Sequence, residues 1–559
     1  MKAARVLAVL ALAFLSVGMT PRERIAYTLT PILAEGALVA VQVDLRFRGE
    51  ADGETVLRLP DEWGGQAELY RAITALEAVS GGQLREGAGP AQRVLAHQPN
   101  ARVHLRYRIA QDHEGPPMAR GGNPYRAVVQ PGYFHLIGHA SFITPEGWDE
   151  AAPVQLRVRA LPRGWRFASD LEHDGLTLGG VGRSVSVGGD FRILHGADRN
   201  IRIAMRGAWG FSDASFAAQV NEIIRGQRNF WGDESTPYLV TVLPLEAPNQ
   251  RARSVGGTGL GDAFAFFATA NTEESRITRT LAHESLHTWI PHRIGGMPAQ
   301  QESSDYWLSE GFTDFYTGRM LVRQGLWGPA DYAADFNATL NAYAHSSARA
   351  APNARVVEAF WTDPDVRQLP YQRGRLLAAI WDQRLRAEGR SFDALMHAMS
   401  ARAGAGEEGP ASALLAREAA SIGFAADYQS YIVEGAEIVL PEDVFAPCGR
   451  VQTDLRPRFA LGFDFEATRA DQRGVTTGVD PLGPAYAAGL RDGMRLLRFS
   501  TQYDPDSEIV LAVRDGEGER EMRYMPRSRE TVRVQHFVLA EPLEGAALDA
   551  CRTLLGGAH

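Results

Sequence analysis

The sequence predicts a multidomain α+β protein, with an antiparallel β domain first, a mainly helical domain second and a smaller unit of strands last. Its length of 559 residues exceeds what a single core usually organises, so roughly two to four domains are expected. Apolar residues alternate with period two from Ile25 to about Asn200, change to a helical period from about Ala208, and alternate again beyond Cys448.

The composition is globular, and its charge balance excludes several classes of protein. The chain is 45% hydrophobic and 22% charged, and its net charge of -9 argues against a nucleic-acid-binding protein. Its only lysine, Lys2, lies in a segment that we expect to be removed. The mature protein therefore has no lysine for a phosphate-binding loop, a Ser-Lys dyad or a Schiff base.

Residues 1–18 have the pattern of a secretory signal peptide. Lys2 and Arg5 precede an apolar run from Val6 to Leu15, and the small residues Ser16 and Gly18 follow it. This predicts an exported protein, periplasmic or secreted. No second long apolar stretch follows, so we expect no transmembrane span in the mature chain.

The N-terminal β domain is expected over residues 22–205. Its strands show apolar residues at alternate positions, as in the run Val41, Val43, Leu45 and Phe47 and in the run Val103, Leu105, Tyr107 and Ile109. Glycine-containing turns at residues 49, 52–53, 64–65 and 81–82 separate the strands. These patterns predict antiparallel strands with one face exposed to solvent.

The helical domain is expected over residues 206–440. Apolar runs at residues 238–242 and 263–267 predict a small sheet ahead of the long helices. Asn271 and Glu274 form a capping-box pattern, and Pro291 predicts that this helix ends near Trp289. A second helix should run from about Asp305 to Gly325. Residues 404–409 read as a surface loop, and residues 441–448 read as a linker to a unit at 449–540.

The chain has two cysteines, Cys448 and Cys551, which are too few for a thiolate metal site. In an exported protein they are candidates for a disulfide. The alternative is two unrelated buried residues, and the sequence leaves both open.

The most informative motif is His283-Glu284-Ser285-Leu286-His287, which lies in the later turns of the first predicted helix. Residues four apart on a helix are separated by about 40° around the axis and about 6 Å along it, so both imidazoles can bind one ion. Glu284 lies beside this pair, where it can take a proton from a water molecule on the metal. The motif predicts a zinc hydrolase site with one Zn²⁺ per chain.

The third ligand separates the classes of zinc hydrolase. The long metzincin form requires a glycine and a histidine where this chain has Ile290 and Arg293, so that form is excluded. His292 follows Pro291 directly and is interpreted as a turn residue. Glu310, in the first turns of the next helix, is the best remaining ligand.

Two further residues are candidates around this site. Asp314, one turn beyond Glu310, is either a hydrogen-bond acceptor for a ligating imidazole or a solvated helix acid. Tyr371 is a candidate donor to the oxyanion of the transition state. The alternative is that Tyr371 only packs against its neighbours. The chain has 16 tyrosines, and a tyrosine just before a helix usually has such a packing role.

Three segments resemble the glycyl aminopeptidase family of gluzincins, relatives of aminopeptidase N. They are HESLHTW from His283, WLSEGFTDFY from Trp307 and PYQRG from Pro370. The resemblance implies a thermolysin-like catalytic domain behind an N-terminal β domain. It also implies His283, His287 and Glu310 as zinc ligands, Glu284 as general base and Tyr371 as transition-state donor.

The C-terminal unit resembles the PDZ domain that ends many members of this family. Leu461, Gly462 and Phe463 are similar to the loop whose backbone N–H groups bind a peptide carboxylate. Residues 483–494 are similar to the stretch that leads from a PDZ helix into the next strand. The resemblance therefore implies a C-terminal peptide as a ligand of this unit.

The chain departs from the aminopeptidase N pattern ahead of the zinc helix. Those enzymes have a Gly-x-Met-Glu-Asn run whose glutamate binds the substrate amine, whereas residues 256–262 here read GGTGLGD. Either Asp262 replaces the glutamate, or Gly256 and Gly257 form a glycine loop against which the substrate backbone lies. The sequence leaves exopeptidase and endopeptidase activity open.

Together these features predict an exported zinc metallopeptidase that acts on peptide bonds through a zinc-activated water and is aminopeptidase-like. Two alternatives remain: a catalytically inactive PDZ-containing protein that binds peptides, and a zinc hydrolase of non-peptide substrates.

Overall fold

The structure is a computed structural model. It describes residues 24–119, 123–173, 175–233, 237–247, 252–298, 300–407, 409–471, 473–500, 504–516 and 518–557. The predicted signal peptide at residues 1–18 lies outside these ranges. The chain forms two compact units, of which the first is Met1–Ile193 with Ala204–Arg206 and the second is Leu194–Ile203 with Gly207–His559. Each unit is described by itself.

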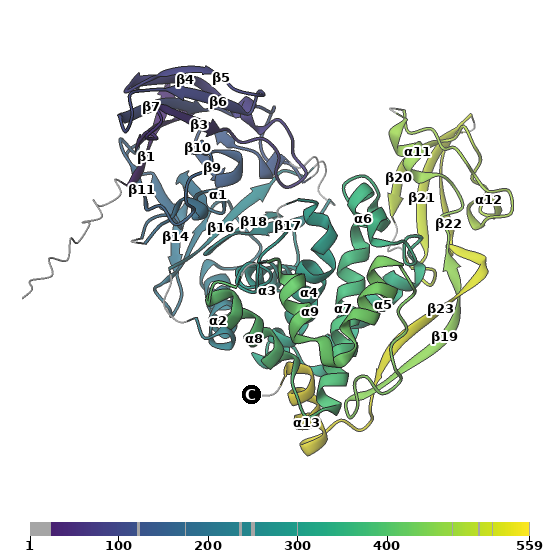
Figure 1. Cartoon of the computed structure of the whole chain (residues 1–559). Coiled ribbons are helices and arrows are strands. Elements are labelled where there is room, and N and C mark those ends of the chain that lie inside the picture. The colour runs from purple at the N-terminus through teal and green to yellow at the C-terminus, as the bar shows by residue number, and fades with distance from the viewer. Residues whose placement is uncertain are drawn as a thin grey trace, which may run out of the picture. The chain divides into compact units, whose positions relative to one another are not determined.

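The first unit contains three sheets, with strand orders β11-β1-β2-β7-β4, β10-β3-β6-β5 and β12-β13-β9-β8 (Figure 1). It also holds one short helix, α1 (Leu178–Gly182). The strands are β1 (Ile25–Ala34), β2 (Ala37–Arg48), β3 (Glu54–Arg58), β4 (Ile73–Ser80), β5 (Gln83–Glu86), β6 (Gln92–Ala96), β7 (Arg102–Ile109), β8 (Val128–Gln130), β9 (Tyr133–Ile137), β10 (Thr144–Pro145), β11 (Val154–Val158), β12 (Arg166–Ser169) and β13 (Val185–Gly189).

The two runs with period two are neighbouring antiparallel strands, as predicted. In β2 and β7, Val43 lies opposite Tyr107 and Leu45 lies opposite Leu105. These side chains are buried in one hydrophobic core, while the residues between them are less buried. The alternation therefore marks the inward face of the sheet.

The next sheet along the chain has the order β14-β15-β16-β18-β17, in which β16 and β18 are parallel and β17 is an antiparallel edge strand. Its strands are β14 (Arg192–His195), β15 (Ile201–Met205), β16 (Tyr238–Leu245), β17 (Val255–Gly259) and β18 (Ala263–Thr269). The helices are α2 (Asp213–Trp231), α3 (Glu274–Leu286), α4 (Tyr306–Arg323), α5 (Pro329–His345), α6 (Asn353–Ala359), α7 (Pro364–Ala387), α8 (Phe392–Gly404), α9 (Ala411–Glu418) and α10 (Phe424–Asp427).

The motif helix α3 is shorter at both ends than the sequence predicts. It begins after Glu273 rather than Asn271, because the Asn271 side chain donates to the Ala252 carbonyl instead of capping the helix. It ends at Leu286 rather than near Trp289. Beyond Leu286 the backbone tightens into turns in which Trp289 N–H bonds to the Leu286 carbonyl at 2.9 Å.

Tyr371 lies inside α7, although the sequence placed it ahead of a helix. The Asp363 side chain accepts hydrogen bonds from the N–H groups of Asp365 and Val366, so the helix begins at Pro364. Pro370 cannot donate to the Val366 carbonyl, yet the helix continues through it. The middle of α7, from Leu369 to Asp382, is mostly buried in the helical core, and this packing outweighs the lost hydrogen bond.

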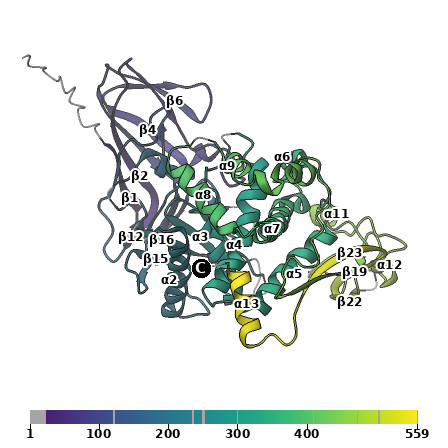
Figure 2. The same cartoon turned by 60° about the horizontal axis from the view of Figure 1, so that its bottom comes forward.

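The segment at residues 441–448 packs into the helical core and is not a free linker. Val444, Phe445 and Cys448 are buried, and the Phe445 ring lies 4.9 Å from that of Phe336. Cys448 forms a disulfide with Cys551 in α13 (Gly545–Gly556), which resolves the alternative left open above. Figure 2 shows α13 beside α4, on which it packs.

The C-terminal strands form the pair β19-β23 and the sheet β20-β21-β22. These elements are β19 (Gly449–Phe459), α11 (Phe465–Ala470), α12 (Pro484–Ala487), β20 (Arg495–Ser500), β21 (Ile509–Asp515), β22 (Gly518–Tyr524) and β23 (Arg527–Leu539). Gly462 has φ 78°, and a Cβ there would lie 2.9 Å from the Ala485 nitrogen. The next element after this loop is α11, not a strand, so the PDZ domain and its peptide ligand stay predictions.

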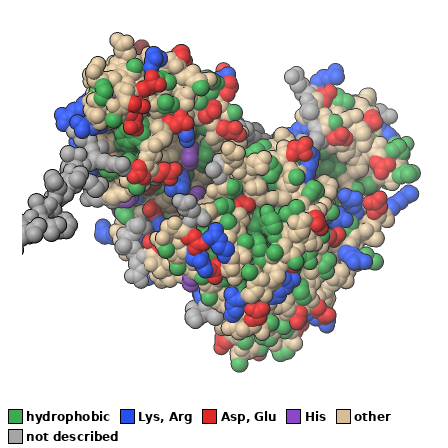
Figure 3. All heavy atoms as spheres, viewed as in Figure 1, with side chains coloured by type: hydrophobic (Ala, Val, Ile, Leu, Met, Phe, Trp, Pro, Cys, Tyr) green, Lys and Arg blue, Asp and Glu red, His purple; other side chains and the backbone are tan. Residues whose placement is uncertain are grey.

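No helix in the described part of the chain is long and apolar enough to cross a membrane. On the face shown in Figure 3, acidic and basic side chains are interspersed, in keeping with the mild net charge of -9. Long-range electrostatic steering of a polyanion is not expected from such a surface.

Candidate metal centre

Helices α3 and α4 bring His283, His287 and Glu310 together. Glu310 Oε2 lies 3.3 Å from His283 Nε2 and 3.4 Å from His287 Nε2. One donor atom from each residue lies within 4.8 Å of the other two, and among the described residues this is the one such group of three. The two imidazoles are one helical turn apart, as the spacing of the motif predicts.

Both imidazoles are held with Nε2 available as a ligand. His283 Nδ1 lies 2.8 Å from Asp314 Oδ1, and His287 Nδ1 lies 2.9 Å from the Ile290 carbonyl. A carbonyl oxygen only accepts, and an ionised carboxylate also accepts, so each Nδ1 carries the hydrogen. The lone pair of each neutral ring is therefore on Nε2, which faces Glu310.

Asp314 accepts from His283 rather than lying free in solvent. Its carboxylate is buried and also accepts from Arg279 Nη2 at 2.9 Å. Burial opposes the charged form of Asp314, but Arg279 and His283 outweigh it and hold the pKa of Asp314 well below its usual range. Of the two interpretations from the sequence, the structure favours the hydrogen-bond acceptor.

The electrostatics of the cluster favour a cation. Burial alone would lower the pKa of His283, but hydrogen bonds to Asp314 and Glu310 outweigh it and raise this pKa to about 10. The two histidines likewise hold the pKa of Glu310 well below its usual range, against the effect of burial. The negative charge that favours this proton would equally favour a metal ion in its place.

The donor set fits zinc. Two neutral imidazole nitrogens and one carboxylate oxygen are a ligand set found in catalytic zinc sites, where a fourth position stays open for water or substrate. Each imidazole also has the Nδ1 acceptor that such sites normally supply, Asp314 for His283 and the Ile290 carbonyl for His287. The sequence did not point to Ile290, because a backbone carbonyl leaves no sequence pattern.

Glu284 lies between the two histidines in sequence and is anchored by the neighbouring strand. Its Oε2 accepts from Gly259 N–H in β17 at 3.1 Å. Burial, aided by the Glu310 charge, raises the pKa of Glu284. A carboxylate with a raised pKa takes up a proton more readily, which suits a general base. The Gly259 contact was not visible in the sequence.

Tyr371 comes from α7 and lies against the first ligand. Its ring stacks on that of His283, with the centroids 6.1 Å apart and the planes at 23°. Burial and the charges of Glu310 and Glu284 raise the pKa of Tyr371 well above its usual value. The phenol therefore stays protonated and can act as a hydrogen-bond donor.

Two glycines explain how α7 brings Tyr371 to the ligands. Gly311 follows Glu310 in α4, and a Cβ there would lie 2.3 Å from Gly374 Cα. A Cβ on Gly374 would lie 1.7 Å from the Trp307 carbonyl oxygen. The helices cross at a distance that only glycine permits, which accounts for the glycine in both of the segments WLSEG and PYQRG.

The predicted substrate-binding residues lie in and after β17. Gly256 and Gly257 belong to this edge strand, opposite Phe267 and Phe266 of β18. Asp262, in the turn that follows, pairs with Arg293 Nη2 at 2.8 Å. Its charge is therefore balanced within the protein by Arg293.

Glu302 is an acidic group near the ligands that the sequence did not single out. It begins the short turn η4 (Glu302–Asp305) just before α4. Desolvation and the Glu310 carboxylate raise the pKa of Glu302, so the two carboxylates are within electrostatic reach of each other. Within the described residues, the Glu302 carboxylate forms no ion pair or side-chain hydrogen bond, whereas Asp262 pairs with Arg293.

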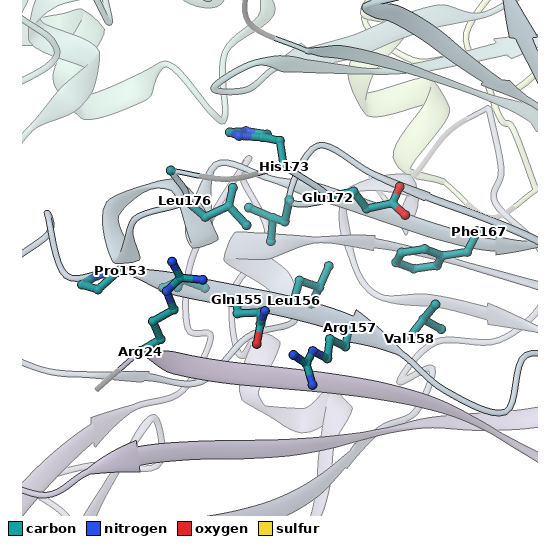
Figure 4. A pocket seen from close by; sticks show the side chains of 13 residues that line it. Arg24, Pro153, Gln155, Leu156, Arg157, Val158, Phe167, Glu172, His173 and Leu176 are labelled. Atoms are coloured by element: carbon teal, nitrogen blue, oxygen red, sulfur yellow. The ribbon is translucent and has the colours of Figure 1, made fainter. Parts of the chain in front are cut away.

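The first unit has a cavity of its own, of about 450 Å³, beside the edge strand β11 (Figure 4). Its labelled lining includes Arg157, Phe167, Glu172 and Leu176. Within the described residues, no group of three metal-binding side chains lies there. The group of three metal-binding side chains, His283, His287 and Glu310, lies in the second unit.

The M61 glycyl aminopeptidase family model matches residues 276–363, a range that includes the two histidines, Glu284 and Glu310. This confirms the resemblance to the glycyl aminopeptidase family over that part of the chain. The match supports a peptidase. No curated protein sequence matches the chain.

The fold is similar to that of a solved protein of the aminopeptidase N family. A crystal structure of an aminopeptidase N family protein from Idiomarina loihiensis aligns with a TM-score of 0.65 and 16% identity, over 95% of this chain and 100% of that chain. An M1 zinc metallopeptidase from Deinococcus radiodurans gives 0.48 and 17%, over 75% and 95%. Yeast LTA4 hydrolase gives 0.46 and 14%, over 76% and 69%. The first alignment shows a shared fold.

Proposed function

We propose that this chain is an exported zinc metallopeptidase that cleaves peptide bonds and prefers substrates with a free amino terminus. The observation that carries the proposal is the orientation of the two imidazoles. Both Nδ1 atoms are occupied by acceptors, both Nε2 atoms face Glu310, and Glu284 is held beside them. This arrangement is suited to one zinc ion and a catalytic base.

A zinc ion bound by His283, His287 and Glu310 would supply Lewis acidity, lowering the pKa of a water molecule and polarising a peptide carbonyl. Glu284 takes the proton of the attacking water and later gives it to the amine that leaves. The Gly259 N–H fixes the Glu284 carboxylate during both transfers. Tyr371 donates a hydrogen bond to the oxyanion that forms on the substrate.

Replacing Tyr371 by phenylalanine should lower kcat by about 10²- to 10³-fold, because one oxyanion donor is lost while the ring and its stacking on His283 remain. KM and zinc content should stay near their wild-type values. Steady-state kinetics with a chromogenic peptide measure this. Tyr332→Phe, a buried tyrosine of the same core, is the control, and an equal fall in that variant would contradict the role of Tyr371.

The substrate backbone is proposed to lie along β17. This strand is at the edge of its sheet, and α3 packs against it. An extended peptide can add to such an edge through backbone hydrogen bonds. Gly256 and Gly257 then let the substrate backbone approach closely. Glu302 is proposed to bind the substrate ammonium group, because Asp262 is paired with Arg293.

The substrate preference is tested with matched peptides that carry a free or an acetylated amino terminus. The zinc-loaded wild type should cleave the free peptides faster. Glu302→Gln should raise KM for the free peptides by about 10-fold through the loss of a charged hydrogen bond, and leave the acetylated ones unchanged. Asp262→Asn is the control. Equal cleavage of free and acetylated peptides by the wild type would rule out an obligate aminopeptidase.

The peptide assay also separates this proposal from its alternatives. A catalytically inactive peptide-binding protein would bind peptides and release no product. A zinc hydrolase of non-peptide substrates would turn over esters or epoxides and leave peptides intact. If the wild-type protein bound zinc but cleaved no peptide in a random library, the peptidase proposal would be contradicted.

A further inference from the structure

A chain of ion pairs continues behind the metal centre, beyond Asp314. Arg279 donates through Nη2 to Asp314 at 2.9 Å and through Nε to Asp335 at 2.7 Å. Asp335 accepts in turn from Arg375 Nη2 at 2.5 Å. Two cations and two carboxylates thus alternate from the imidazole of His283 to Arg375.

The ion-pair chain joins the four helices around the site. Arg279 is one turn before His283 in α3, and Asp314 is one turn after Glu310 in α4. Asp335 comes from α5, and Arg375 is one turn after Tyr371 in α7. Because residues four apart share a helix face, Arg279, Asp314 and Arg375 each lie on the face of their helix that a ligand or Tyr371 also uses.

Asp335 is the member on which the others depend. Arg375 is fully buried, and among the described residues Asp335 is the one carboxylate paired with it. Arg279 presents Nε and Nη2 to two different carboxylates, so Asp335 sets the direction of the guanidinium that reaches Asp314. Without Asp335, the Arg279 side chain is free to change its contact with Asp314.

We propose that Asp335 is a positioning residue for the metal centre, and this rests on the proposed function above. By holding Arg279 and Arg375, it keeps the Asp314 carboxylate behind His283 and keeps the turn of α7 that bears Tyr371 in place. Asp335 touches neither the metal ligands nor the substrate. It acts through Arg279 and Arg375 alone.

The test uses the full-length protein with the double variant Asp335→Asn/Arg375→Met. Replacing both partners avoids leaving Arg375 as an unpaired buried charge, and methionine can pack on Phe336 as Arg375 does. The dissociation constant for Zn²⁺, measured by chelator competition, should rise about 10- to 100-fold, and kcat should fall by a similar factor with KM nearly unchanged. Unchanged zinc affinity and kcat in the folded double variant would overturn the proposal.

Two further variants separate positioning from general stability. Arg375→Met alone keeps the Asp335–Arg279 pair, so its zinc affinity should stay near wild type. Arg319→Met/Asp382→Asn removes the buried Arg319–Asp382 pair between α4 and α7 together with the Arg319–Asp393 pair. Neither pair includes Asp314, so zinc affinity should again stay unchanged. If the first double variant does not fold, Arg279→Gln breaks the same chain at a half-buried residue and should weaken zinc binding equally.

Amide hydrogen exchange tests the role of Asp335 independently of whether the proposed function is correct. In the metal-free protein, residues 281–287 should exchange faster in Asp335→Asn/Arg375→Met than in Arg319→Met/Asp382→Asn. If the wild type bound no zinc, the proposed function would fail, and the exchange rates would still decide the role of Asp335. Equal exchange in the two double variants would overturn it.

Discussion

Replacing Glu284 by glutamine is expected to lower kcat by about 10²- to 10⁴-fold, because the water that attacks the peptide carbonyl then has no base to take its proton. Glutamine has the same shape, and its amide oxygen can still accept from Gly259 N–H. The fold and the ligand geometry should therefore be preserved, with one zinc ion per chain by metal analysis.

The matched control for this exchange is Glu274→Gln. Glu274 is an exposed acid in the first turn of the same helix, so it tests the loss of a negative charge on α3 without touching the site. Its kcat should equal that of the wild type. A Glu284→Gln protein that holds zinc and turns over within about threefold of the wild type would exclude Glu284 as the base.

Without the metal, the protein should lose stability as the pH rises above neutral. In the metal-free protein the pKa of His283 is raised to about 10, so the protonated ring is favoured by the fold. A group whose folded pKa is raised contributes stability that is full below its unfolded pKa of about 6.5 and is lost as pH rises towards 10. The metal-free protein should therefore be less stable at pH 9 than at pH 6.

Zinc should remove this loss, because the metal takes the place of the proton on Nε2 and binds the neutral ring. The apparent Tm measured at pH 6 and pH 9, with zinc and with a chelator, gives the comparison. His283→Gln should reduce the alkaline loss in the metal-free protein, while the raised pKa of His287 leaves a part of it. An undiminished loss in that variant would assign the pH dependence to other groups.

The sequence was sufficient where a pattern is local. The alternation of Val43 and Leu45 predicted β2 and its inward face, and the spacing of His283 and His287 predicted two rings on one helix face. Neither inference needs a partner far along the chain. The helix ends were predicted less well, since the Asn271 side chain bonds to Ala252 and the backbone tightens into turns after Leu286.

The role of Tyr371 could not be settled from the sequence. A proline at position 370 usually marks a helix boundary, and only the packing of α7 in the core explains why the helix continues. Likewise, Asp262 reads as an available acid, whereas its pairing with Arg293 becomes visible only in the fold.

By itself the sequence predicted the metal-binding chemistry proposed for this protein, because His283, Glu284, His287 and Glu310 are recognised by residue type and by helical spacing. Tertiary structure alone decided how those groups are held. The Ile290 carbonyl, the Gly259 N–H, the crossing of Gly311 on Gly374 and the ion pairs of Asp335 join segments with no common pattern in sequence. Orientation depends on contacts between distant segments, and such contacts form only when the core has packed.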